Sequence, residues 1–314
     1  MRIAVIGLGL IGGSLLRALG GAGHDVVGFD ADPATRELAR ESGFQVAGSV
    51  REAAFESDVA VLAVPLPILP EVVADLDGYG GLITDVTSVK GPVRDLLEGR
   101  RFVGGHPMAG KETSGFAASE AGLFEGCAWV LCLEPHGTDL DDWLLLAGLF
   151  TAMGARVVPV TAAEHDTTVA QISHVPHLFA AVLADQLLSN PLAGTLAAGS
   201  FRDGTRVAAT RPELIAAMCG GNWSSVHREL HLLIGELEQL AADLTLPDPI
   251  EALTFHLRRA SEARRAWPSA EGRTDTLTAD IQALLALGRS GGWVTSVNGT
   301  EVVGKRPGPD RFLL

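Results

Sequence analysis

The sequence predicts an α/β protein in which a Rossmann-type, doubly wound parallel sheet is followed by an all-helical dimerisation domain. Short apolar runs alternate with helix-forming segments up to about residue 105, as in a parallel sheet covered by helices. A glycine-rich turn follows the first run, and long segments with helical periodicity replace the β-branched runs after about residue 160. We therefore expect a Rossmann-type domain at residues 1–160, a helical domain at 161–289, and a short tail or hairpin at 290–314.

The first domain is expected to alternate strands and helices. The run at residues 59–64 is wholly apolar and closed by Pro65, as in a central parallel strand covered on both faces. Two later strands, at residues 128–134 and 155–160, are expected on either side of a helix at 140–153. The remaining expected strands are residues 2–6, 25–29, 44–47, 81–86 and 101–105, and the remaining helices are residues 14–19, 33–42, 69–76 and 93–98.

The second half reads as helices at residues 164–188, 212–242 and 250–266. In the middle segment apolar residues recur every three or four positions, so one face of that helix is apolar. Because helices with such faces pack against each other or against a second subunit, we expect a homodimer through this half. The last stretch contains two short apolar pairs among glycines and polar residues, which fits a hairpin or a loose tail.

Composition narrows the class of partner. The chain has a formal net charge of -14 and no basic cluster, which disfavours nucleic acid and anionic membranes and favours a small molecule. Three cysteines without a CxxC pair fit a reducing cytoplasm, and neither a targeting segment nor an apolar run of about 18 residues is evident. We expect no metal site, because the pairs His174/His177 and His227/His231 have no third ligand nearby in the sequence.

A dinucleotide fingerprint follows the first strand. Gly7 allows a tight turn, Gly9 allows the backbone to approach a pyrophosphate, and Gly12 allows the next helix to pack closely. Asp30 lies 18 residues after Gly12, where a carboxylate accepts from the ribose 2′-hydroxyl and repels a 2′-phosphate, so NAD is the expected cofactor. The expected cofactor-binding residues are Gly7, Gly9, Leu10, Ile11, Gly12, Ser14, Asp30, Val64, Pro65 and Ser88.

Residues 104–115 are the candidate catalytic stretch. His106 is followed directly by a proline and is expected where a strand gives way to a loop, at the carboxyl edge of the sheet where open α/β sheets bind ligands. Ser88 follows another strand and could orient this histidine, or it could only cap the next helix. His177 is either a pocket residue or a core histidine, and Arg206 is either a carboxylate-binding residue or a solvated one.

Five motifs in order resemble those of the prephenate/arogenate dehydrogenase family. The resemblance covers roughly residues 1–265 and implies oxidative decarboxylation of prephenate or arogenate by NAD in tyrosine biosynthesis. On the matching positions, it implies that His106 takes the proton of the ring hydroxyl and that Ser88 holds this imidazole and the nicotinamide. The motifs are residues 7–14, 84–90, 104–110, 173–177 and 201–206. The expected substrate-binding residues are Arg206, His177, Lys111, Glu112 and Arg202.

Other functions remain open at this point. Lys111 and Gly204 depart from the family's pattern, which leaves the choice between prephenate, arogenate and a para-amino analogue undecided. A β-hydroxyacid dehydrogenase would need a catalytic lysine in the helical half, but the sequence has no lysine between Lys111 and Lys305. A protein that only senses NAD would bind the cofactor without turnover. Strictness for NAD over NADP and feedback by tyrosine are not predicted.

Overall fold

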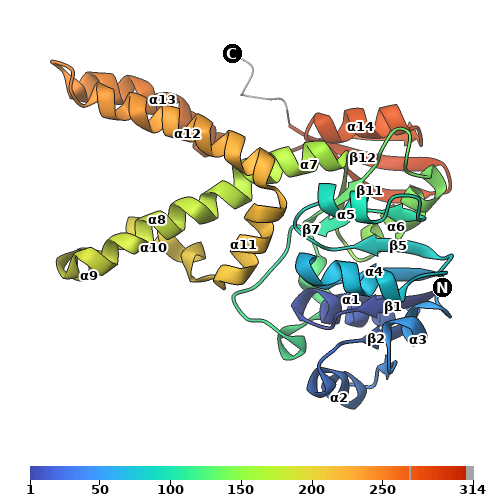
Figure 1. The fold of residues 1–314 in the computed structure, drawn as a ribbon. Helices are drawn as coiled ribbons and strands as arrows, with labels where there is room; N and C mark the ends of the chain where they lie inside the picture. Colours follow the sequence, from blue (N-terminus) through green and yellow to red (C-terminus); the bar gives the residue numbers. More distant parts are fainter. Residues whose placement is uncertain (269, 309–314) are drawn as a thin grey trace.

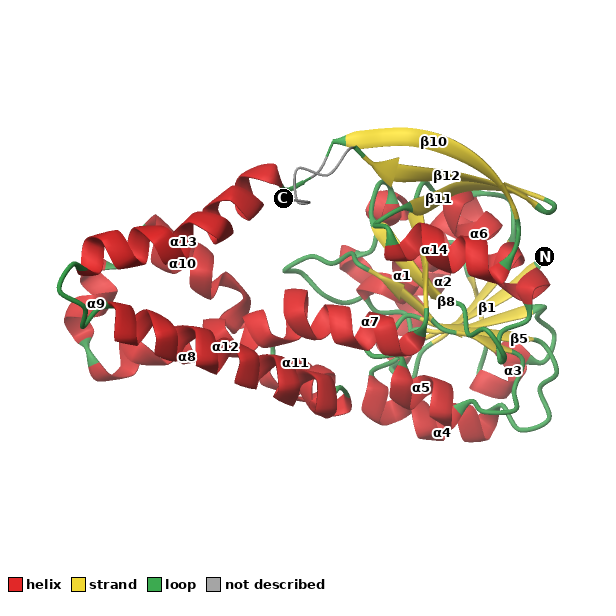
Figure 2. Cartoon of the chain, turned by 90° about the horizontal axis from the view of Figure 1, so that it is seen from above, coloured by secondary structure: helices red, strands yellow, loops and turns green. Residues whose placement is uncertain are grey.

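The computed structural model describes residues 1–268 and 270–308. Two sheets with their covering helices form one end of the molecule, and long helices project from it as an arm (Figures 1 and 2). The predicted fold class, a doubly wound parallel sheet followed by a helical part, is confirmed.

The first sheet has the strand order β3-β2-β1-β4-β5-β6, and all its strands are parallel. This is the order of dinucleotide-binding folds, in which the ligand crevice opens between β1 and β4. The strands are β1 (Arg2–Ile6), β2 (Asp25–Phe29), β3 (Gln45–Val46), β4 (Val59–Leu62), β5 (Leu82–Asp85) and β6 (Phe102–Val103). The helices between them are α1 (Leu10–Gly21), α2 (Pro33–Glu41), α3 (Val50–Ala54), η1 (Leu66–Ile68), α4 (Leu69–Asp75) and α5 (Gly91–Leu96).

The carboxyl ends of the central strands lie level with one another. Ile6 of β1 pairs with Leu62 of β4, which in turn pairs with Asp85 of β5. The segments that follow these three residues therefore start at one edge of the sheet. β4 is buried along its whole length, as expected of a central strand covered on both faces.

A second sheet follows the first and receives the chain directly from β6. Its order is β10-β12-β11-β9-β8-β7. His106 lies inside β7 (Gly105–Pro107), which corrects the expectation of a loop: after Val103 the chain turns and pairs antiparallel with β8. The predicted strands at 128–134 and 155–160 are present as β8 (Ala128–Cys132) and β9 (Arg156–Val160). The elements between β7 and β9 are η2 (Phe116–Ala118), η3 (Ala121–Phe124) and α6 (Leu140–Ala152).

The expectations for the end of the chain were partly wrong. Residues 271–289 were assigned to the helical domain, but β10 (Glu271–Thr278) and α14 (Ile281–Arg289) return to the second sheet. There β11 (Trp293–Asn298) forms a hairpin with β12 (Glu301–Pro307) (Figure 1). β11 also pairs with β9. The physical reason is burial, since Leu284, Leu285 and Leu287 of α14 lie fully inside the main core. Residues 309–314 of the predicted tail lie outside the described part.

The helical half runs from α7 to α13. Its elements are α7 (Ala162–Val169), a π-helical turn (Ala170–His174), α8 (Val175–Ser189), α9 (Pro191–Leu196), α10 (Gly199–Thr205), η5 (Arg206–Ala209), α11 (Pro212–Gly221), α12 (Trp223–Asp243) and α13 (Pro249–Ala266). The single helix predicted at 212–242 is broken at the buried Asn222. The domain boundary placed near residue 160 falls between β9 and α7 and stays a prediction. None of the described helices is long and apolar enough to cross a bilayer.

The helical half has little core of its own. Its buried cluster consists of Ala170, Val175 and Val226 only, among the described residues. In contrast, many large apolar side chains of α8, α12 and α13 are exposed, for example Leu188, Leu232 and Phe255. The arm therefore presents apolar surface that this single chain leaves uncovered.

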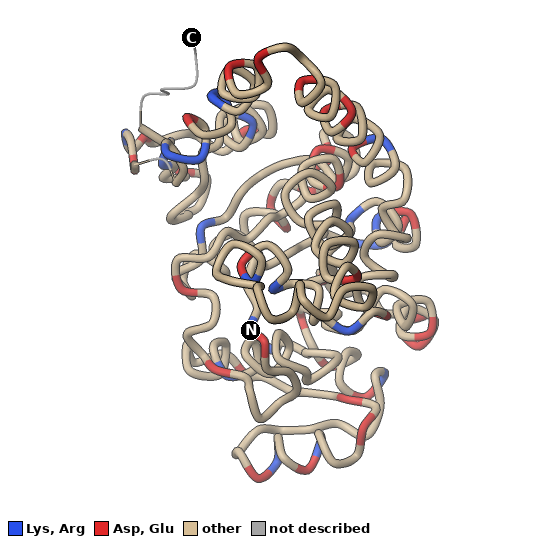
Figure 3. Tube along the Cα trace, turned by 90° about the vertical axis from the view of Figure 1, so that its left-hand side faces the viewer, with Lys and Arg blue, Asp and Glu red and all other residues tan. Residues whose placement is uncertain are grey.

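Lys and Arg positions are spread among Asp and Glu positions in both halves (Figure 3).

Candidate active site

The glycine turn between β1 and α1 has the geometry of a nucleotide site. Gly7 has a φ of +93°, and a Cβ there would lie 2.5 Å from the carbonyl oxygen of Ala63. A Cβ on Gly12 would lie 1.8 Å from the carbonyl oxygen of Gly7, so the helix can approach the turn only with glycine. Gly9 borders open space, and no side chain caps α1. The first amides of α1, including those of Leu10 and Ile11, are therefore available to an anion.

The other expected cofactor residues divide into two groups. Val64 and Pro65 follow β4 at the edge of the crevice. Asp30 directly follows β2, and its carboxylate accepts from the amide of Leu8 at 2.7 Å. Ser14 is a correction, because its side chain is fully buried and its Oγ accepts from the amide of Glu120 at 3.0 Å. Ser14 therefore holds the segment before η3 against α1 instead of facing a pyrophosphate.

His106 is a nearly buried imidazole with one ring nitrogen held and one free. The residue is 9% exposed, and its Nδ1 lies 2.9 Å from Nε2 of His165 on α7. Its Nε2 makes no hydrogen bond to any described residue and is not sealed from solvent. Burial, and then the neighbouring His165, Lys90 and His174, hold the pKa of His106 well below its usual range. The ring is therefore neutral and able to accept a proton at neutral pH.

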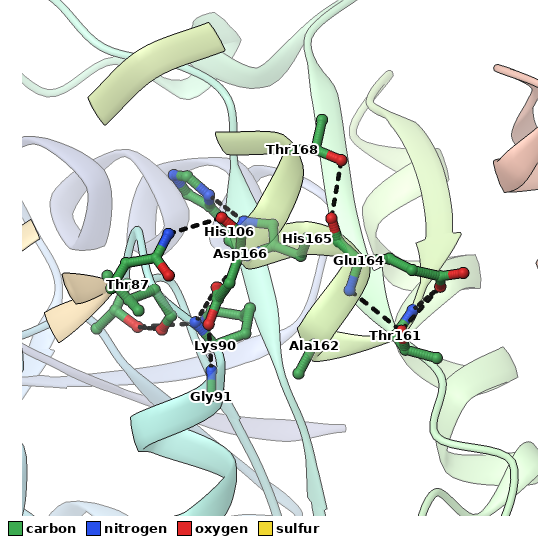
Figure 4. A network of polar contacts seen from close by, with 12 residues as sticks. Thr87, Lys90, Gly91, His106, Thr161, Ala162, Glu164, His165, Asp166 and Thr168 are labelled. Atoms are coloured by element: carbon green, nitrogen blue, oxygen red, sulfur yellow. Dashed lines mark hydrogen bonds and ion pairs between the residues drawn. The ribbon is translucent and has the colours of Figure 1, made fainter. Parts of the chain in front are cut away.

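His165 is in turn held by the carboxylate of Asp166. Nδ1 of His165 lies 2.7 Å from Oδ1 of Asp166, and both carboxylate oxygens also accept backbone amides, those of Lys90 and Gly91, at 2.8 Å each (Figure 4). Burial alone would raise the pKa of Asp166, but these hydrogen bonds outweigh it and leave the pKa below its usual range. The hydrogen-bonded chain from His106 through His165 therefore ends at an anionic carboxylate.

A buried ion pair fixes the strand that carries His106. Lys90 and Asp85 are both almost fully buried, and the Lys90 ammonium is paired with Oδ2 of Asp85. The same ammonium donates to the carbonyl oxygen of Gly105 at 2.6 Å, while the amide of Gly105 donates to Oδ1 of Asp85 at 3.1 Å. Thr87 completes the cluster by donating its amide to Asp85. Because both polar groups of Gly105 are held, the position of the next residue, His106, is fixed from the first sheet.

Ser88 fills neither of the two roles expected from the sequence, which were to orient His106 or to cap the next helix. Its side chain makes no hydrogen bond to any described residue, and Nδ1 of His106 is bound to His165 instead. Ser88 does not cap the next helix either, since the amides at the start of α5 are capped by Asp166 from α7. The residue is half-buried. Its hydroxyl is therefore free at the carboxyl edge of the sheet.

The π-helical turn before Pro176 brings two more histidines to this region. His174 is fully buried, and its Nδ1 lies 3.2 Å from the side-chain amide nitrogen of Asn222. Burial, and then the neighbouring His165, lower the pKa of His174 to about 4. His177 is half-buried, and its Nδ1 donates to the carbonyl oxygen of Ser173 at 2.8 Å. This bond leaves Nε2 of His177 free for a ligand. Proline lacks an amide hydrogen, and the wider turn accommodates that loss.

The structure brings together some of the charged residues expected to bind substrate. Arg206 lies 3.7 Å from the carboxylate of Glu112, which links the stretch after β7 to the helical half. Lys111 is instead paired with Glu120 at 2.7 Å, and Arg202 is exposed without an ion pair among the described residues. The described residues contain no group of three or more side chains placed to hold a metal ion.

Reasoning from sequence missed His165, Asp166 and Lys90. The first two lie in the opening turn of α7, which begins with a capping box formed by Thr161 and Glu164. A histidine next to an aspartate just after this box was a usable signal, because the box fixes where the helix begins. Lys90 gave no comparable signal, since its burial depends on the packing of two sheets.

Two family models match the chain. The one described as "Prephenate dehydrogenase, nucleotide-binding domain" matches residues 13–159, and the one described as "Prephenate dehydrogenase, dimerization domain" matches residues 161–258. A curated relative, the prephenate dehydrogenase of Bacillus subtilis, is 35% identical over 283 residues, which cover 85% of this chain and 76% of the relative.

The chain also resembles solved structures of arogenate and prephenate dehydrogenases. The chain resembles Synechocystis arogenate dehydrogenase with a TM-score of 0.72 and 30% identity, over 85% of this chain and 100% of that one. It resembles the prephenate dehydrogenase of Aquifex aeolicus, in complex with hydroxyphenyl propionate and NAD+, with a TM-score of 0.77 and 26% identity. That match covers 84% of this chain and 97% of the other.

Proposed function

This chain belongs to the prephenate dehydrogenase family, and from that premise we propose that it oxidatively decarboxylates prephenate or arogenate with NAD, in tyrosine biosynthesis. The observation that carries the proposal is His106, a nearly buried neutral imidazole with a free Nε2 at the carboxyl edge of a Rossmann-type sheet. A base of this kind can take the hydroxyl proton of a cyclohexadienol. The family relationship selects that substrate class.

The residues around the glycine turn fit NAD. The uncapped start of α1, the open space at Gly9 and the carboxylate of Asp30 would receive the pyrophosphate and the adenosine ribose. Val64, Pro65 and the free hydroxyl of Ser88 would border the nicotinamide end. When bound, NAD supplies the acceptor for the hydride that leaves the substrate. We assign cofactor binding to residues 1–160, and substrate binding and dimerisation mainly to the helical residues after 160.

The chemistry needs two groups from the protein, a base and a cation that binds the substrate. Nε2 of His106 accepts the proton of the ring hydroxyl as hydride leaves the carbon that bears it. The carbon-carbon bond to the ring carboxylate then breaks, carbon dioxide departs, and its electron pair makes the ring aromatic. A cation must hold the substrate in an otherwise acidic chain, and we assign this task to Arg206, with Arg202, Lys111, Glu112 and His177 around it.

The proposal is tested by an assay of NADH formation. Prephenate and arogenate are offered side by side, each with NAD and with NADP. Turnover of either substrate with NAD is expected. NAD binding without turnover of either substrate would favour an NAD-sensing protein, and turnover only of a para-amino analogue would favour a role in specialised metabolism.

Replacing Arg206 with alanine is expected to raise the KM for the substrate about 10- to 100-fold while changing kcat little. The guanidinium binds a carboxylate equally in the ground and transition states, and a hydrogen bond between charged groups contributes about 1.5–3 kcal/mol. Steady-state kinetics measure the effect. Arg94→Ala, at an exposed arginine paired with Asp95, is the control. An unchanged KM for Arg206→Ala would show that another residue binds the carboxylate.

We also propose that the protein is a homodimer through its helical half. The buried cluster of three residues is too small to stabilise this half, and the exposed apolar side chains of α8, α12 and α13 would be covered by a second copy. Light scattering is expected to give the mass of two chains at micromolar concentration, and a one-chain mass would contradict this proposal. The free cysteines support a cytoplasmic location, which we propose as well.

A further inference from the structure

We propose that His165 and Asp166 are positioning residues that hold His106 in the single tautomer whose Nε2 is unprotonated. The inference rests on the proposed function for its catalytic meaning, but the tautomer itself is a property of the free protein. It follows from a chain of three groups in which Asp166 contacts His165 at 2.7 Å and His165 contacts His106 at 2.9 Å.

The position of each ring hydrogen follows from the state of the Asp166 carboxylate. Asp166 receives backbone amides on both oxygens, and its pKa lies below the usual range, so it is an acceptor only. Nδ1 of His165 must therefore carry a hydrogen that it donates to Asp166. Burial lowers the pKa of His165, although Asp166 opposes this effect, so the ring is neutral and has one hydrogen only. Its Nε2 is consequently a lone pair.

That lone pair determines the state of His106. Nε2 of His165 can only accept, so Nδ1 of His106 must donate across the 2.9 Å contact. Because His106 is also neutral, its one hydrogen is on Nδ1, and Nε2 is the free base. The opposite arrangement would place a nitrogen lone pair of His165 against the carboxylate, which is repulsive. Asn222 supports the chain by donating its side-chain amide to the carbonyl oxygen of Asp166 at 2.6 Å.

The arrangement matters most when His106 becomes charged. As Nε2 takes the substrate proton, Nδ1–H becomes a stronger donor, and the neutral His165 accepts from it while Asp166 supplies negative charge behind. The proton stays on His106. This is the logic by which the aspartate of a serine-hydrolase triad fixes and supports its histidine. The other titratable groups beside the two rings are Lys90, whose charge is paired with Asp85, and the buried His174.

The tautomer can be read without any turnover. In free protein labelled with ¹⁵N-histidine, two-bond nitrogen-proton correlation spectra are expected to show His106 and His165 each with a hydrogen on Nδ1 and none on Nε2. His106→Asn and His165→Gln assign the signals by their loss. A hydrogen on Nε2 of His106 in the wild-type protein would overturn the proposal, whether or not the protein oxidises a cyclohexadienol.

Kinetics then separate positioning from folding. His165→Leu is expected to lower kcat about 10- to 100-fold, as for the loss of a supporting partner of a ligating or reacting group, without changing KM or NAD binding. His165→Gln should recover most of this loss, since its carboxamide oxygen can accept from Nδ1 of His106. His136→Leu, at an exposed histidine, makes the same change outside the network and should leave kcat unchanged. Equal losses in the Leu and Gln variants would contradict the proposed role.

Discussion

Replacing His106 with asparagine is expected to lower kcat by about 10²- to 10⁴-fold while leaving NAD binding intact. The asparagine amide can replace Nδ1 and donate to Nε2 of His165, which lies 2.9 Å from Nδ1 in the native protein. Nothing in the variant replaces Nε2. The change therefore removes the base and keeps the local packing, so that the loss measures the proton transfer itself.

His106→Asn should also change the pH dependence of kcat/KM. The neutral form of His106 is the active form, and the pKa of this residue lies well below its usual range because the ring is buried beside His165 and Lys90. For the native enzyme we expect activity to hold as the pH falls through 7 and to be lost only under more acidic conditions, where His106 takes up a proton. His106→Asn should lack this acid limb. Stopped-flow or steady-state rates across pH provide the measurement.

Calorimetry of NAD binding is the control for the His106 variant. The residues that we propose to bind NAD lie on the glycine turn and after β2, β4 and β5, and none of them is hydrogen-bonded to the His106 side chain. Weaker NAD binding by His106→Asn would therefore assign His106 a structural role. A kcat within a few-fold of the native value would rule out His106 as the base.

The first sheet could be predicted because its signals are local. Most strands from residue 2 to residue 85 are short apolar runs, each of them is followed by a helix, and the glycine turn marks where the alternation begins. Connections between parallel neighbours leave few possible topologies. The strand order β3-β2-β1-β4-β5-β6 is the one that these rules favour.

The second sheet could not be predicted in the same way. Its pairing of Val294 with Val157 joins segments far apart in the sequence, and neither segment carries a sign of the other. Residues 281–289 form a helix, α14, but no separate helix was predicted there, and the sequence contains no indication that it packs beside β9 and not in the arm. The location of a helix depends on which apolar surface remains uncovered after the rest has folded, and that is a property of the whole chain.

The site shows the same division between local and non-local signals. His106, His177 and Arg206 belong to short motifs that can be recognised in the sequence. The partner of His106 could not be chosen, because Ser88 and His165 are both polar residues that begin or precede a helix. Only the packing of α7 against α5 shows that Asp166 caps α5 and that His165 then reaches β7.

Replacing Lys90 with methionine is expected to reduce the free energy of unfolding by about 3–5 kcal/mol, because it leaves the buried carboxylate of Asp85 without its partner. The ammonium also holds the carbonyl oxygen of Gly105 at 2.6 Å, directly before His106. Methionine fills a similar volume but cannot donate. We therefore expect kcat to fall as well, since the strand that carries the base is no longer fixed. Urea unfolding and steady-state kinetics measure the two effects.

Two matched variants test whether burial of the Lys90–Asp85 pair explains the loss of stability in Lys90→Met. Lys305→Met makes the same chemical change in the exposed pair with Glu271 and should alter stability by no more than about 1 kcal/mol. In the double variant Lys90→Met with Asp85→Asn, no charge remains buried without a partner, so part of the lost stability should return. If Lys90→Met proved no more destabilising than Lys305→Met, the ion pair would not be what holds β7, and the position of His106 would depend on the pairing of β7 with β8 and on His165.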